Sequence, residues 1–411
     1  MFRTVAARAA LASVAVAALL ACASAASAKP ILMPNMIEEQ QHDQIAGAIT
    51  PPAPPCPQNA IGISCTPVPE TPALGVPFPG NMAYYGGHVQ VHPKEYLVYW
   101  GWGQSGAWPA GTNCSSETIT EGSLNATLPC DPDGAGKYMA DFLQQAGGTD
   151  WANVSTQYYE SDSSAAQTHI SNDPNLLAGI WVDDTDPNTL PQTSSSNAAG
   201  PTNTLTVLGQ EAQAAAQHFG ITDLADANIV IVQPPGLSDP NALSQGYCAF
   251  HDYVWPGLES GVYNGLQQGL SYTNIPYQLA INSGGTNVCG ENAVNSGAQG
   301  KLDGFSIVLG HEMEETITDP GAEDIVGSGT SPQHLGGWYD TLDANENGDK
   351  CAWVGLNVAT GQGTVPIPGA LGDIKGNGGE TFAVQSLWSN AANAGTGYCA
   401  GVNDSPLPSG S

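Results

Sequence analysis

The chain has 411 residues, and 38 acidic side chains against 8 lysines and arginines give it a formal net charge of −30. This charge excludes nucleic acids and anionic membranes as favourable partners, because both would be repelled. Only 11% of the residues are charged, and many carboxylates with few lysines indicate a protein suited to acidic surroundings, where self-repulsion decreases.

The first 28 residues predict a secretory signal peptide. Two arginines precede an apolar run over residues 9–20, and the small residues 26–28 (Ala-Ser-Ala) are typical of a cleavage site. The apolar run is too short to span a bilayer. The alternative is a lipoprotein anchored through Cys22, because residues 19–22 (LLAC) resemble a lipobox. We therefore expect a secreted, extracellular protein without an integral membrane segment.

Removing Cys22 from the nine cysteines leaves an even number, which in an exported chain predicts four disulfides. The sequence alone leaves the pairing open. The simplest pairing joins neighbours along the chain: Cys56–Cys65, Cys114–Cys130, Cys248–Cys289 and Cys351–Cys399. No spacing is C-x-x-C, so a cysteine zinc site is not expected.

The distribution of proline divides the chain into segments. Residues 29–81 are rich in proline, which predicts an extended arm or a short propeptide. The following residues 82–402 are enough to bury a substantial core, and we expect them to form a single catalytic-type α/β domain. Residues 403–411 are expected to be a flexible tail.

Strands and helices alternate along the predicted domain. Apolar runs predict strands at Glu95–Trp100, Leu177–Val182, Ile229–Gln233 and Tyr277–Ile281. Longer stretches between them predict helices at Gly136–Ala146, Thr206–His218 and Asp303–Ile317. This order predicts an α/β fold with a mixed sheet, flanking helices and a substantial parallel portion, stabilised by disulfides.

The most informative segment is His311-Glu312-Met313-Glu314-Glu315, which follows an apolar run. In a helix, His311 and Glu315 lie one turn apart on one face. Both can bind one Zn²⁺, with Glu312 beside the metal to activate a water molecule. The familiar zinc-peptidase motif is H-E-x-x-H, and here a carboxylate replaces the second histidine. The alternative interpretation is a solvated acidic face.

Two residues should mark the ends of this helix. Asp303 is a plausible N-cap, and Pro320 disfavours helical geometry in the residue before it.

A loop rich in oxygen ligands follows the helix, over residues 337–351. It can supply a third metal ligand, and three protein ligands plus water define a catalytic zinc site. Glu346 is the first choice and Asp349 the second. Asp340 and His334 are further candidates.

The same loop has an alternative use. Asp343, Asn345 and Asn347, followed by Gly348, match the first half of a calcium-binding loop. The twelfth position is Val354 and not glutamate, so an EF-hand is not expected, but a looser Ca²⁺ site stays open.

Other histidines carry weaker signals. His251 follows Cys248 by three residues and is a candidate to donate to a tetrahedral oxyanion, although a structural role beside a disulfide is equally expected. His88 and His92 alternate along the chain before Pro93. They indicate a surface edge strand more than a metal site.

Several short motifs occur in a fixed order over residues 82–401. They are Tyr99-Trp100-Gly101, Gln157-Tyr158-Tyr159, Tyr247-Cys248-x-x-His251, His311-Glu312-x-x-Glu315-x-x-Thr318-Asp319-Pro320, Trp338-Tyr339-Asp340, Glu346-x-Gly348-Asp349-x-Cys351 and Trp388-Ser389-Asn390. This order resembles the EXORDIUM / phosphate-induced protein 1 group, and more closely its secreted bacterial and fungal relatives. In such relatives the helix reads H-E-x-x-E-A-x-T-D-P and the loop E-I-G-D-x-C; this chain departs at Thr316 and Asn347.

The resemblance implies a metallopeptidase-like, zincin-related core. By position it implies His311, Glu315 and Glu346 as the metal set, Glu312 as the base and Asp349 as the aspartate of the loop motif. The plant members of the group are known chiefly as extracellular growth-related proteins, so the resemblance leaves activity open.

We therefore expect a secreted zinc endopeptidase that acts on a polypeptide substrate and is a monomer. The alternative is a non-catalytic, extracellular wall- or glycan-associated binding protein with a structural calcium site.

Overall fold

The computed structural model describes residues 81–161, 165–187, 207–238, 242, 248–254, 269–283, 286–287, 289–321, 325–326, 333–334, 336–340, 345–351 and 371–402. Several predictions lie outside the described residues. They are the signal peptide 1–28 with Cys22, the proline-rich arm up to residue 80 with the Cys56–Cys65 bridge, the tail 403–411 and Asp343.

A five-stranded mixed sheet lies at the centre of the fold, in the order β7-β2-β8-β10-β9. Its strands are β2 (Lys94–Trp100), β7 (Leu177–Asp183), β8 (Ala227–Val232), β9 (Phe250–Val254) and β10 (Leu270–Ile275). Strands β7, β2, β8 and β10 are parallel, and β9 is antiparallel to β10. All six residues of β8 are buried, as expected for a parallel strand covered on both faces. The predicted mixed sheet is confirmed.

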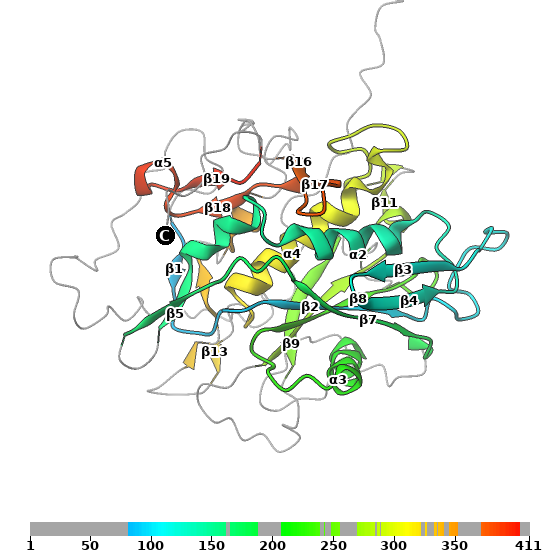
Figure 1. The fold of residues 1–411 in the computed structure, drawn as a ribbon, viewed down its shortest axis with the longest axis horizontal. Coiled ribbons are helices and arrows are strands. Elements are labelled where there is room, and N and C mark those ends of the chain that lie inside the picture. The colour runs from blue at the N-terminus through cyan, green and yellow to red at the C-terminus, as the bar shows by residue number, and fades with distance from the viewer. Residues whose placement is uncertain are drawn as a thin grey trace, which may run out of the picture.

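Three long helices flank this sheet. They are α2 (Ala135–Ala146), α3 (Val207–Phe219) and α4 (Asp303–Thr318), so the three helix predictions are confirmed to within one residue at each end. Helices α2 and α4 lie on one side of the sheet and α3 on the other (Figure 1).

Helix α4 runs through the interior, and all sixteen of its residues are buried. Two glycines permit this position. A Cβ on Gly304 would lie 2.0 Å from the Cys289 carbonyl oxygen, and a Cβ on Gly310 would lie 3.0 Å from the Trp151 ring. Close packing on all sides is typical of a core helix, so the interpretation of its glutamates as a solvated face is wrong.

Shorter elements surround this frame. The two-stranded sheets are β1 (Ala83–Tyr84) with β15 (Trp338–Tyr339), β3 (Glu117–Glu121) with β4 (Leu124–Leu128), β5 (Tyr159–Ser161) with β6 (Gln167–His169), β11 (Asn282–Ser283) with β12 (Thr286–Asn287), β13 (Ile325–Val326) with β14 (Gln333–His334), β16 (Leu371–Lys375) with β17 (Thr381–Gln385), and β18 (Leu387–Ser389) with β19 (Tyr398–Ala400). The short helices are η1 (Ala152–Gln157), η4 (Gln278–Ala280), η5 (Gly300–Leu302), η6 (Asp349–Cys351) and α5 (Ala392–Gly395).

The strand predicted at Tyr277–Ile281 is wrong, because this segment contains the short helix η4. Its apolar character has another cause: the Tyr277 ring packs against Trp108 and Phe305 in the core. The strand of this region is β10, which ends at Ile275, two residues before Tyr277.

Asp303 is not the N-cap of α4. Helix η5 leads directly into α4, so Asp303 is its first residue. The Asp303 carboxylate accepts hydrogen bonds from the backbone N–H groups of Val294 and Asn295, at 2.9 and 2.7 Å. It therefore fixes the preceding loop.

The predicted edge strand at His88 and His92 is also wrong, since the backbone there belongs to no strand. His88 pairs with Glu160 and with the Ala225 carbonyl oxygen. His92 is exposed.

Three disulfides join the predicted neighbours: Cys114–Cys130, Cys248–Cys289 and Cys351–Cys399. These predictions are confirmed, and such bonds are typical of an oxidising, extracellular environment. Among the described residues, no helix has the length and apolar character needed to cross a membrane.

Candidate metal centre

Helix α4 positions the central pair of the site. His311 and Glu315 lie one turn apart, with 3.1 Å between His311 Nε2 and Glu315 Oε1. Both residues are buried, as is Glu312. Both ring nitrogens of His311 lack a hydrogen bond among the described residues, so the imidazole can act as a ligand to an ion.

The loop over residues 345–351 brings Asp349 to this pair. Asp349 Oδ1 lies 3.7 Å from His311 Nε2, and the Asp349 backbone N–H donates to Glu315 Oε1 at 2.8 Å. Gly348 allows the approach, because a Cβ there would lie 2.5 Å from Glu315 Oε1 and 2.9 Å from His311 Nδ1. No other residue type fits this position without moving the two side chains.

Contacts from the C-terminal strands hold this loop against α4. The Gln385 side chain donates to the Gly348 carbonyl oxygen at 2.7 Å, and the Trp388 backbone N–H donates to the Asn347 carbonyl oxygen at 2.7 Å. The Cys351–Cys399 disulfide ties the end of the loop to β19. The ligand-bearing loop is therefore fixed by residues far along the chain.

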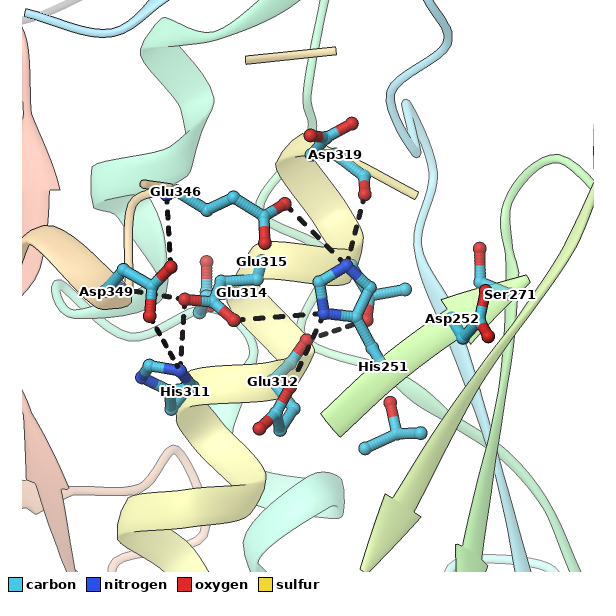
Figure 2. A network of polar contacts seen from close by, with 12 residues as sticks. His251, Asp252, Ser271, His311, Glu312, Glu314, Glu315, Asp319, Glu346 and Asp349 are labelled. Atoms are coloured by element: carbon cyan, nitrogen blue, oxygen red, sulfur yellow. Dashed lines mark hydrogen bonds and ion pairs between the residues drawn. The ribbon is translucent and has the colours of Figure 1, made fainter. Parts of the chain in front are cut away.

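Strand β9 contributes a second imidazole, that of His251, which is 2% exposed. His251 Nδ1 lies 3.4 Å from Glu312 Oε2 and 3.8 Å from Glu315 Oε2. On the other side of the ring, Nε2 lies 3.3 Å from the Asp319 carbonyl oxygen and 3.7 Å from Glu346 Oε1. His251 therefore contacts the candidate base Glu312 directly (Figure 2).

The other candidate ligands have different surroundings. Glu346 lies beside His251, whereas Asp349 lies beside His311. Asp340 accepts from the buried Lys350 ammonium at 2.8 Å. His334 lies in β14, and its side chain is not described.

The asparagines of the proposed calcium loop are engaged with protein groups. The Asn345 side-chain amide donates to Asp340 at 3.4 Å, and that of Asn347 donates to the Ser155 hydroxyl at 3.3 Å. These contacts direct the two side chains to separate partners.

Glu314 is on the same helix but has its own environment. Burial raises the pKa of its carboxyl group to about 8, and the hydrogen bond from the Ser155 hydroxyl opposes this shift. Sequence reasoning missed Ser155 because it lies 159 positions away along the chain.

The cluster has an excess of buried acid. Three buried carboxylates (Glu312, Glu315 and Glu346) and the partly buried Asp349 accompany two imidazoles. Lys350 is engaged with Asp340 and the Trp388 ring. Buried carboxylates are costly unless they are paired, protonated or bound to a metal. Two groups of side chains could hold a metal ion: His311, Glu315 and Asp349, and His251, Glu312 and Glu315. Nitrogen and carboxylate ligands of this kind suit Zn²⁺ and similar divalent ions.

No protein-family model, curated protein or solved structure matches this chain. The comparisons thus neither support nor refute the resemblance to the EXORDIUM group, which stays a prediction. The function has to be argued from the chemistry of the site.

Proposed function

We propose that the protein is a secreted, metal-dependent hydrolase that cleaves peptide bonds with Zn²⁺. The observation that carries the proposal is the buried pair of His311 Nε2 and Glu315 Oε1, 3.1 Å apart, with the Asp349 carboxylate completing a three-ligand group. Three protein ligands with a remaining open position are typical of catalytic zinc. The disulfides of the chain support the extracellular part of the proposal.

The residues of the chain have separate tasks in this proposal. His311, Glu315 and Asp349 hold the cation, which when bound supplies Lewis-acid activation of a water molecule and of the scissile carbonyl. Glu312 takes the proton of the attacking water and passes it to the leaving amine. His251, whose Nδ1 lies 3.4 Å from Glu312 Oε2, lies directly beside that carboxylate.

The ligand chemistry favours zinc over calcium. Calcium selects oxygen ligands, whereas both metal-capable groups contain an imidazole nitrogen.

The test combines elemental analysis of the purified chain with hydrolysis of a library of unstructured peptides. Replacing Glu312 with glutamine should lower kcat/KM by about 10²–10⁴-fold, the contribution of a general base, while the His311 group keeps its zinc. His311→Ala should remove both that zinc and the hydrolysis. His92→Ala, at an exposed histidine whose hydrogen-bond partners are Asp226 and Ser171, is the matched control and should leave both unchanged.

Two results would contradict the proposal. A zinc-loaded protein that cleaves no peptide in the library would exclude the peptidase activity. Full hydrolysis by Glu312→Gln would exclude Glu312 as the base.

A further inference from the structure

The two carboxylate oxygens of Glu315 face different imidazoles. Oε1 lies 3.1 Å from His311 Nε2, and Oε2 lies 3.8 Å from His251 Nδ1. Figure 2 shows the Glu315 carboxylate between the two rings. A carboxylate in this position can bridge two cations, as in two-metal hydrolytic sites where the ions are about 3.5–4 Å apart.

The His251 side of this bridge has its own ligand group. His251 Nδ1, a Glu312 oxygen and a Glu315 oxygen lie within 4.8 Å of one another, and all three residues are buried. This group shares only Glu315 with the His311 group. The two groups therefore define two positions for an ion.

The orientation of His251 is that of a metal ligand. Its Nε2 faces the Asp319 carbonyl oxygen at 3.3 Å, and because a carbonyl oxygen only accepts, Nε2 carries the proton. Histidine ligands commonly donate their second ring N–H to a backbone carbonyl or carboxylate in this way. The Nδ1 lone pair then points towards oxygens of Glu312 and Glu315. Three potential ligand atoms converge there, an arrangement that a cation among them would stabilise.

We infer that the protein binds a second divalent cation, held by His251, Glu312 and Glu315, with Glu315 bridging to the cation at His311. The inference rests on the proposed function, because it takes the group of His311, Glu315 and Asp349 to hold the first cation. Glu312 binds the second cation through Oε2, the atom that faces His251, and keeps Oε1 for the proton of the attacking water. The formal charges of the four carboxylates Glu312, Glu315, Glu346 and Asp349 together equal those of two divalent ions.

A proton can take the place of the second cation. If His251 carried protons on both ring nitrogens, the imidazolium would neutralise Glu312 and Glu315 through the same contacts. This arrangement and the two-cation arrangement differ in the number of ions bound, which makes stoichiometry the decisive measurement.

The experiment uses the full chain, stripped with a chelator and titrated with Zn²⁺ alone, followed by elemental analysis. The wild type is expected to bind two equivalents. His251→Ala and His311→Ala should each bind one, and His92→Ala should bind two. Substitution with Co²⁺ provides a measurement that needs no variant, because two Co²⁺ ions that share the Glu315 carboxylate should give a spin-coupled paramagnetic resonance spectrum.

Saturation of the wild type at one equivalent, with an uncoupled Co²⁺ spectrum, would overturn the inference. So would the loss of all metal from both histidine variants, since a single ion would then use both imidazoles. If a variant fails to fold by circular dichroism, the wild-type stoichiometry and the Co²⁺ spectrum still decide. Peptide hydrolysis is measured separately: two equivalents without hydrolysis would reject only the proposed function, and hydrolysis with one equivalent would reject only the second site.

Discussion

Replacing Glu95 with glutamine should change how the stability of the protein depends on pH. Glu95 lies in β2, and its carboxyl group is fully buried in the central sheet. The Asn228 side chain donates to Glu95 Oε2 at 2.9 Å and to the Thr273 hydroxyl at 3.0 Å. Burial raises the pKa of Glu95 to about 8, the Asn228 hydrogen bond opposes the shift, and the charge of Glu314 adds to it.

The raised pKa determines the sign of the effect. The folded state binds the Glu95 proton more tightly than the unfolded chain, whose carboxyl has the ordinary pKa of 4.5. The stabilising contribution is therefore fully present below pH 4.5 and is lost as the pH rises through the folded-state pKa of about 8. A shift of this size corresponds to a loss of about 3 kcal/mol of unfolding free energy between roughly pH 5 and pH 8. A glutamine does not ionise, so the Glu95→Gln variant lacks this term.

The assay is urea unfolding of the disulfide-intact, chelator-treated protein across this pH range. The free energy of unfolding of the wild type should fall by about 3 kcal/mol more than that of Glu95→Gln. Glu117→Gln, on the β3–β4 hairpin, controls for the removal of one negative charge. Parallel curves for the wild type and Glu95→Gln would refute the reasoning, because the buried carboxyl would then contribute nothing to the pH dependence.

Two further predictions concern the loop that carries Asp349. Gly348→Ala should weaken zinc binding by about 10–100-fold, because its Cβ would lie 2.5 Å from Glu315 Oε1; a competition titration against a chromogenic chelator measures this, and unchanged affinity would contradict the close approach. Replacing Cys351 and Cys399 together with serine should lower the free energy of unfolding by about 2–5 kcal/mol and also weaken zinc binding, since the disulfide anchors the loop. Denaturation and the same titration test both effects. A destabilised variant with full zinc affinity would show that the hydrogen bonds from Gln385 and Trp388 hold the loop in place without the disulfide.

The sequence predicted strands from continuous apolar runs. The run Ala227–Val232 is buried throughout, and it overlaps the predicted strand Ile229–Gln233. Strand β10 was missed because buried polar residues interrupt its pattern: Ser271 donates to the Pro320 carbonyl oxygen, and Thr273 exchanges hydrogen bonds with Asn228. Such residues are tolerated inside a sheet only through partners that are distant in sequence, and a local pattern does not contain those partners.

In the candidate site, too, local spacing was informative, whereas contacts between residues distant in sequence were not predictable. The approach of His311 and Glu315 follows from helical spacing alone, so it was predictable. The order of Glu346 and Asp349 as candidate ligands depends on how the loop turns over α4. That turn is set by hydrogen bonds from Gln385 and Trp388, which no spacing within the loop reveals.

Stability and metal binding should respond to pH in opposite directions. The carboxyl groups of Glu95, Glu211 and Glu314 have a pKa of about 8 because they are buried, so they favour the folded state at acidic pH. This agrees with the acidic composition of the chain. Metal binding instead requires deprotonated ligands: carboxylates in ionised form and imidazoles in neutral form. Acid therefore favours the fold through these three carboxyl groups while it weakens metal binding by protonating the ligands, and the protein should function where both the fold and the metal site are maintained.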